Sequence, residues 1–120
     1  MASPGEIVEQ YFDAWTSKDF ETARSLLQDD LSFIGPIETL DNADALMESI
    51  NGLAQIVTGA ERRGLVEQGD EVCVIYDLHT IPVPDAPVAE WHTVRGGKIV
   101  SMQAFFDARP FAAMFEQGQG

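Results

Sequence analysis

The sequence predicts an α+β domain in which three N-terminal helices pack on a strongly curved, mainly antiparallel sheet. Two observations support this prediction. Apolar residues recur at helical spacing mainly in the first part of the chain, and strand-like runs separated by turn residues fill most of the remainder. Helices gathered on one face of an antiparallel sheet are the arrangement that this order favours. A strongly curved sheet that closes over helices forms a cone, so we expect an apolar pocket inside.

Each of the three expected helices has a capping signal. The run from Ser3 to Glu6 has the form of a capping box with proline at the first helical position, and it precedes an apolar face made by Ile7, Val8, Tyr11, Phe12 and Trp15. Residues 17–18 break this helix. Asp19 caps a second helix that buries Phe20, Ala23, Leu26 and Leu27. Asp41 or Asn42 caps a third, which runs to residue 51 and buries Leu46, Met47 and Ile50.

The first three strands are separated by turn residues. A short strand over residues 31–34 stops at Gly35-Pro36, and a long run over residues 55–66 reads as extended. Gly69-Asp70 then turns the chain into a strand over residues 71–80. The prolines that follow make the next connection irregular.

A hairpin closes the sheet. Two strand-like runs, one beginning at Glu90 and one ending at Asp107, flank a Gly96-Gly97 pair, which is a strong hairpin signal. Beyond the hairpin, Pro110 starts a short helix or turn with Phe111, Met114 and Phe115. The tail over residues 117–120 is expected to fray.

The composition is that of a single acidic domain over residues 1–120. Hydrophobic residues make up 45% of the chain, and 20 acidic residues outweigh 7 Lys and Arg for a formal charge of −13. Nucleic acids and anionic membranes both require a basic patch, so neither is an expected partner. The one cysteine, Cys73, excludes an internal disulfide. With no signal-peptide pattern and no membrane-spanning segment expected, a cytoplasmic location is the default.

The hairpin carries the best candidates for chemistry. Glu90 and His92 lie two positions apart and therefore point to the same face of their strand. Asp107 follows Phe105 and Phe106, and desolvation there would raise its pKa into the range of a usable acid or base. Alternatively, Asp107 caps the helix at Pro110 or pairs with Arg109. If Met102, Ala104 and Phe106 face the cavity, strict alternation points Asp107 away from it unless a bulge intervenes.

The preceding strand offers a second pair. Asp77 and His79 share one face, together with Cys73 and Ile75. If that face is concave, Asp77 and His79 reach the same cavity as the hairpin side chains; otherwise the histidines are structural groups. The spacing of these residues is not that of a helical histidine pair or a thiolate motif, so no metal site is predicted.

Aromatic residues complete the candidate set. Tyr11 and Trp15 lie one helical turn apart, either as plain core or with the Tyr11 hydroxyl as a donor to the pocket. Trp91 faces opposite to Glu90 and His92. Because tryptophan is enriched at interfaces, it favours a homodimer through the outer face of the sheet.

These elements resemble the nuclear-transport-factor-2-like superfamily, and within it the SnoaL-like polyketide cyclases and ketosteroid isomerases. The resemblance covers residues 6–115. It rests on the aromatic first helix, the Asp19-Phe20-Glu21 pattern before residues 26–30, the Gly35-Pro36 turn and the Gly-Lys-Ile-Val strand that ends in Phe-Phe-Asp. This superfamily hosts enzymes, binding modules and adaptors, so the resemblance implies the fold more specifically than the function.

The resemblance to SnoaL-like cyclases implies roles for three positions. In these cyclases a histidine three residues before an arginine lies in the penultimate strand, with a polar partner two residues earlier and an acid/base aspartate at the end of the last strand. Here His92 precedes Arg95, Glu90 takes the partner position and Asp107 matches the aspartate.

Two related patterns match less well. Ketosteroid isomerases use a first-helix tyrosine and a protonated acid, which Tyr11 and Glu90 match, but their base precedes the proline after the first strand, where this chain has Gly35. Limonene-epoxide-hydrolase-like members pair their carboxylate with an arginine and an aspartate two apart, where this chain has Glu90 and His92.

The expected function is a cofactor-free isomerase or cyclase-type lyase that moves a proton next to the carbonyl of a small hydrophobic compound. The expected catalytic residues are Asp107, His92, Glu90 and Tyr11. The expected substrate-binding residues are Trp15, Phe33, Ile75, Asp77, His79, Met102 and Phe106. The alternative is a non-catalytic ligand-binding or adaptor module on the same fold.

Overall fold

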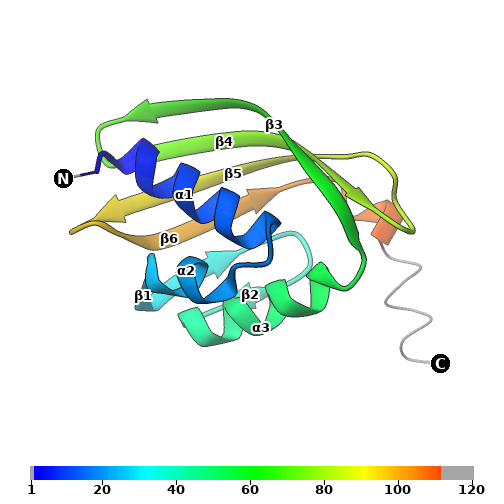
Figure 1. Ribbon diagram of the computed structural model, residues 1–120, viewed down its shortest axis with the longest axis horizontal. Coiled ribbons are helices and arrows are strands. Elements are labelled where there is room, and N and C mark those ends of the chain that lie inside the picture. Colours follow the sequence, from blue (N-terminus) through cyan, green and yellow to red (C-terminus); the bar gives the residue numbers. More distant parts are fainter. Residues whose placement is uncertain (1, 112–120) are drawn as a thin grey trace.

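The computed structural model describes residues 2–111. In chain order the elements are α1 (Pro4–Thr16), α2 (Phe20–Ser25), β1 (Leu27–Ile34), β2 (Thr39–Leu40), α3 (Ala43–Ala54), β3 (Val57–Gln68), β4 (Glu71–Thr80), β5 (Ala86–Arg95) and β6 (Lys98–Phe105). The strands form one sheet in the order β2-β1-β6-β5-β4-β3, in which only the β1–β6 pair is parallel. The helices lie together on one side of this curved sheet (Figure 1), which confirms the predicted α+β class.

The predicted helix starts are confirmed at all three helices. Ser3 and Glu6 form a reciprocal capping box, and Asp19 accepts a hydrogen bond from the backbone N–H of Thr22. At α3 the cap is Asn42 rather than Asp41, because the Asn42 side chain accepts a 2.7 Å bond from the backbone N–H of Ala45. These bonds satisfy donors that a helix start otherwise leaves unpaired.

Register and side-chain alternation assign each strand residue to one face of the sheet. On the concave face His92 lies between Val72 and Met102 on the neighbouring strands, and one row further Glu90 lies between Val74 and Ala104. The intervening residues, such as Trp91, point to the outer face. The concave side chains are buried against the aromatic face of α1, which forms the core of the domain.

Several boundaries differ from the sequence prediction. The strand β1 begins at Leu27, so this buried leucine belongs to the strand rather than to the second helix. The two-residue strand β2 was not predicted, because it carries no period of its own and exists by pairing with β1. Helical backbone resumes at residues 109–111, whereas Met114, Phe115 and the tail over residues 117–120 lie outside the described residues.

None of the helices within residues 2–111 has the length and apolarity that crossing a membrane requires.

Candidate functional site

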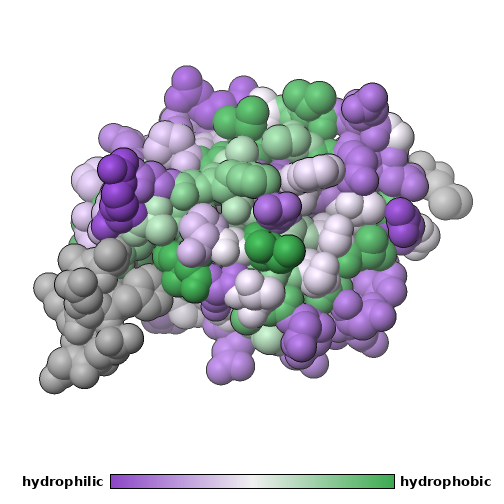
Figure 2. Space-filling model, turned by 180° about the vertical axis from the view of Figure 1, so that it is seen from behind, coloured by the Kyte–Doolittle hydropathy of each residue, from purple (hydrophilic) through white to green (hydrophobic). Residues whose placement is uncertain are grey.

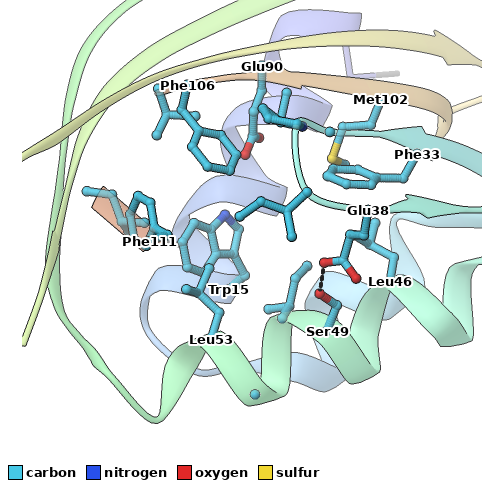
Figure 3. Close-up of a pocket in the computed structure, with 18 of the residues that line it drawn as sticks. Trp15, Phe33, Glu38, Leu46, Ser49, Leu53, Glu90, Met102, Phe106 and Phe111 are labelled. Atoms are coloured by element: carbon cyan, nitrogen blue, oxygen red, sulfur yellow. Dashed lines mark hydrogen bonds between the residues drawn. The ribbon is translucent and has the colours of Figure 1, made fainter. Parts of the chain in front are cut away.

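A cavity of about 410 Å³ lies between the helices and the concave face of the sheet (Figure 3). Helices α1 and α3, the segment over residues 35–38 and strands β4 to β6 all contribute to its wall. Its aromatic lining consists of Tyr11, Trp15, Phe33, Tyr76, Phe106 and Phe111. Of the seven residues expected to bind substrate, four line this cavity: Trp15, Phe33, Met102 and Phe106. The site is therefore a deep, largely apolar pocket, which suits a hydrophobic small molecule.

Glu90 brings a carboxylate into this apolar wall. Its residue is only 8% exposed, and its side chain lines the pocket. The Tyr76 hydroxyl donates a 2.6 Å hydrogen bond to Oε2, and Nε2 of His92 lies 3.2 Å from Oε1. Both partners occupy the concave face, Tyr76 on β4 and His92 two residues along β5. Because its two oxygens are bonded to different partners, the Glu90 carboxylate is held in one orientation toward the cavity.

His92 lies behind Glu90 rather than in the pocket wall. The imidazole is fully buried, and the Tyr11 ring packs edge-on against it with the ring centroids 6.0 Å apart. In the tautomer that carries its hydrogen on Nε2, the ring donates a hydrogen bond to Glu90, and Nδ1 carries a lone pair that can accept one. Within residues 2–111, Nδ1 has no hydrogen-bond partner. The expected pair of His92 and Glu90 thus exists, but Glu90 is the member that faces the ligand space.

Helix α1 presents two further polar groups to the cavity. Tyr11 and Trp15 are 2% and 3% exposed and line the pocket one helical turn apart. Burial, and secondarily the charge of Glu90, raises the pKa of Tyr11 well above its usual value of 10.0. The same causes, with the hydrogen bond to Glu90, raise the pKa of Tyr76. Both phenols therefore keep their protons at ordinary pH and act as neutral hydrogen-bond donors.

The carboxylate of Asp107 lies elsewhere. It accepts 2.9 Å and 2.7 Å bonds from the Arg109 guanidinium and a 3.0 Å bond from the Arg109 backbone N–H. These bonds, the side-chain bond foremost, lower the pKa of Asp107 to about 2. The expectation of a desolvated Asp107 with a raised pKa is wrong, because β6 ends at Phe105 and Asp107 follows in an exposed connection that does not line the pocket.

Asp77 and His79 lie on the outer face of the sheet. The concave positions of β4 belong to Val72, Val74, Tyr76 and Leu78, so the alternate residues point outward. Asp77 pairs with Arg63 on β3, and His79 Nδ1 lies 2.7 Å from the Pro84 carbonyl and 3.1 Å from the Asp85 carboxylate. Ile75 is 43% exposed on that face. Asp77, His79 and Ile75 would reach the pocket only from the concave face, so they do not reach it.

The charged side chains in the pocket wall are all acidic. Besides Glu90, the lining holds Glu38 and Glu48, and within residues 2–111 it holds no lysine, arginine or histidine. Glu38 accepts a hydrogen bond from Ser49 of α3 on the side of the cavity opposite Glu90 (Figure 3). Sequence reasoning missed Glu38, Glu48 and Ser49, since nothing in the local pattern brings the turn after β1 toward α3. The wall is unfavourable for an anion.

Within the described part of the chain, no three histidine, cysteine, aspartate or glutamate side chains gather closely enough to hold a metal ion. The structure does bring together Tyr11, Trp15, Tyr76 and Glu90 in the wall of one cavity, with His92 behind Glu90. It combines one carboxylate with several donors, which is a combination suited to moving a proton next to an acceptor oxygen.

The comparisons with known proteins identify the family. The model of the SnoaL-like domain matches residues 8–102. This chain belongs to the SnoaL-like domain family. A protein of known structure from Kribbella flavida DSM 17836 is 30% identical to it, with 97% of each chain covered and a TM-score of 0.87.

Less similar structures show the same fold. An NTF2-like protein from Cytophaga hutchinsonii ATCC 33406 is 20% identical, over 93% of this chain and 96% of its own, with a TM-score of 0.82. A protein with a ketosteroid isomerase-like fold from Catenulispora acidiphila DSM 44928, in complex with trimethylamine, is 22% identical over 85% of each chain, with a TM-score of 0.72. No curated protein sequence matches. The predicted SnoaL-like, NTF2-like fold is confirmed.

Proposed function

We propose that this SnoaL-like domain is a cofactor-free isomerase or cyclase-type lyase that moves a proton next to the carbonyl of an uncharged hydrophobic compound, with Glu90 as the proton-transferring group. The observation that carries the proposal is the placement of the Glu90 carboxylate in an aromatic pocket wall, held by Tyr76 and His92. Glu90 thereby takes the role that we expected of Asp107.

The chemistry follows from the positions of the groups. A ligand bound with an α-carbon C–H toward Glu90 loses that proton to the carboxylate, and the C–H electron pair moves into the carbonyl to form an enolate. The Tyr11 hydroxyl donates a hydrogen bond to the enolate oxygen. In a β,γ-unsaturated ketone the enolate is a dienolate, and return of the proton from Glu90 to the γ-carbon moves the double bond into conjugation and completes an isomerisation. Walls that exclude water strengthen each of these interactions.

His92 and Tyr76 are positioning residues in this proposal. Neither needs to touch the ligand, because each holds one oxygen of Glu90. Orientation of a base within the pocket is worth a large part of the rate that such an enzyme achieves. The family supports a small-molecule ligand: the Catenulispora neighbour holds trimethylamine, a small organic molecule.

Exchange of α-protons tests the proposal directly. A panel of uncharged cyclic ketones is incubated with the protein in D₂O, and loss of the α-proton signal is followed by NMR. We expect catalysed exchange with at least one ketone and a loss of about 100-fold or more in Glu90→Gln, the usual size of a general acid/base contribution. The matched control is Asp107→Asn, which we expect to retain the wild-type rate. Exchange that survives Glu90→Gln but not Asp107→Asn rules the proposal out.

One observation favours a second function. The family's expected acid/base position, Asp107, is paired with Arg109 outside the pocket, which suits a non-catalytic ligand-binding module. A module of this kind binds ligand without catalysing exchange, and its affinity does not depend on Glu90. Calorimetry on Glu90→Gln with a ketone that binds but does not exchange distinguishes the two functions.

We further propose that two copies associate through the outer face of the sheet. Apolar side chains gather on that face (Figure 2), where Ile34, Val66, Ile75, Trp91 and Phe105 are all more than two-fifths exposed. Exposed apolar patches of this kind mark interaction sites. Sedimentation of Phe105→Lys is expected to show a monomer, whereas Ile81→Lys, in the connection after β4, leaves the dimer intact. A wild-type monomer at every concentration contradicts this proposal of a dimer.

The cytoplasmic location stays a prediction.

A further inference from the structure

We propose that the indole N–H of Trp15 is a hydrogen-bond donor to the ligand, which together with the Tyr11 hydroxyl selects compounds that present an acceptor oxygen to this wall of the pocket. The inference names the ligand class of the same site and so rests on the pocket of the proposed function, but it does not require that the bound compound react.

The first observation is a donor that has no protein partner and opens onto the cavity. Trp15 is only 3% exposed, and its Nε1 makes no hydrogen bond to any group of residues 2–111. This nitrogen is not among the fully enclosed atoms that lack a partner, so it borders the cavity. A buried indole N–H usually has a partner. The other tryptophan shows the contrast, since Trp91 is half-exposed and still donates a 2.9 Å bond from Nε1 to Glu71.

The second observation is the direction of that donor. The indole nitrogen of Trp15 points into the cavity, toward the side where the carboxylate of Glu90 lies (Figure 3). The ring is fixed in this direction by edge contacts with Phe12 and Tyr76, at centroid distances of 6.1 Å and 6.3 Å. The N–H therefore cannot turn toward the protein interior without disturbing both contacts.

The third observation is a second donor beside it. The Tyr11 hydroxyl, one turn earlier on α1, also makes no hydrogen bond within residues 2–111 although the residue is 2% exposed and lines the cavity. Two donors on one wall are matched by a carbonyl oxygen, which has two lone pairs. A hydrocarbon offers neither donor a partner, and a protonated amine offers no lone pair. Ketones, quinones and lactones are among the compounds whose oxygen satisfies both donors.

The two tryptophans make an internally controlled NMR experiment. A ¹⁵N-labelled protein gives one indole N–H signal for Trp15 and one for Trp91, assigned with Trp91→Phe. The probes are 2-acetonaphthone and 2-isopropenylnaphthalene, which share a shape but differ in having C=O or C=CH₂. We expect the ketone to move the Trp15 indole proton downfield, and the hydrocarbon to leave it without that shift. The Trp91 signal is the control for effects outside the pocket.

Affinities provide the second readout. In Trp15→Phe, checked for folding by its circular dichroism and thermal unfolding, we expect about tenfold weaker binding of the ketone, the usual size of one lost hydrogen bond, with the hydrocarbon within about twofold of wild type. Equal losses for both probes, equal indole shifts, or no binding of the ketone at its solubility limit overturn the proposal. A downfield shift of Trp15 together with no α-proton exchange for any ketone of the panel supports the donor and refutes the proposed catalysis.

Discussion

The hydroxyl of Tyr76 donates a 2.6 Å hydrogen bond to Oε2 of Glu90 across the neighbouring strands β4 and β5. Both residues are buried, at 3% and 8% exposure. A buried carboxylate without partners is costly, so this bond and the contact with His92 are what allow Glu90 to remain in an apolar wall. The orientation of the Glu90 carboxylate consequently depends on Tyr76 and His92.

Removing the Tyr76 hydroxyl should destabilise the fold. Tyr76→Phe keeps the ring in its aromatic contacts but deprives buried Glu90 of a donor, so we expect a loss of about 1–3 kcal/mol in the free energy of unfolding, measured with urea. Tyr11→Phe is the matched control, because its hydroxyl makes no bond within residues 2–111, and should cost less than about 0.5 kcal/mol. Equal losses in the two variants would mean that the Glu90 bond contributes nothing specific.

The α3 cap provides a second test of stability. Asn42→Ala removes the acceptor for the Ala45 backbone N–H and should lower the free energy of unfolding by about 1 kcal/mol. Asp41→Ala, one residue earlier, removes no acceptor from the start of the helix and should cost little. The experiment is thermal or urea unfolding of both variants, and a larger loss for Asp41→Ala would reassign the cap.

The acid titration of Asp107 depends on Arg109. Its pKa of about 2 lies below the usual 3.8, so the pair stabilises the fold fully above pH 3.8, and this contribution is lost as pH falls through about 2. In Arg109→Ala we expect the pKa of Asp107 to rise toward 3.8, because the foremost cause of the lowering is removed. Carboxyl ¹³C NMR measures this. A pKa that stays near 2 in the variant would assign the lowering to another group.

His79 should titrate above its usual value of 6.5. The Pro84 carbonyl is the foremost cause of its raised pKa, and the Asp85 carboxylate adds to it. A raised pKa means that the protonated ring stabilises the fold fully below pH 6.5, and that this contribution is lost as pH rises through the folded pKa. Imidazole NMR of Asp85→Asn should show a partial fall, since the carbonyl remains. Asp30→Asn removes the same charge from β1, on the far side of β5 and β6, and should leave the titration unchanged.

The sequence allowed us to predict which residues of β5 share one face of the sheet. Glu90 and His92 are two apart in a strand whose alternation is regular through both of them, so their common face followed directly. For β4 the same rule gave two sets, and apolar residues occur in both. The set with Val72, Val74 and Tyr76 faces inward, and the outward set keeps Ile75 as an exposed apolar residue. Periodicity alone could not say which set the core would take.

Two other features lay beyond sequence reasoning for different reasons. The placement of Asp107 in the pocket required a bulge at the end of β6, but the register shift between β5 and β6 lies at residues 93–94, far from that end. The approach of Glu38 to Ser49 depends on how the turn after β1 meets α3, eleven positions along the chain. Such contacts between elements are set by packing and leave no local pattern.

The division of the pocket wall between elements has an evolutionary consequence. The groups able to handle protons and oxygens stand on α1 and on the central strands β4 and β5, whereas much of the remaining wall comes from residues 35–38 and from α3. Substitutions at Ser49 or Leu53 alter the space offered to a ligand without moving Glu90 or its two supports. Under the proposed function, ligand size and reactivity are therefore set by different elements, so substitutions on α3 change which compounds fit while the groups proposed to react stay in place.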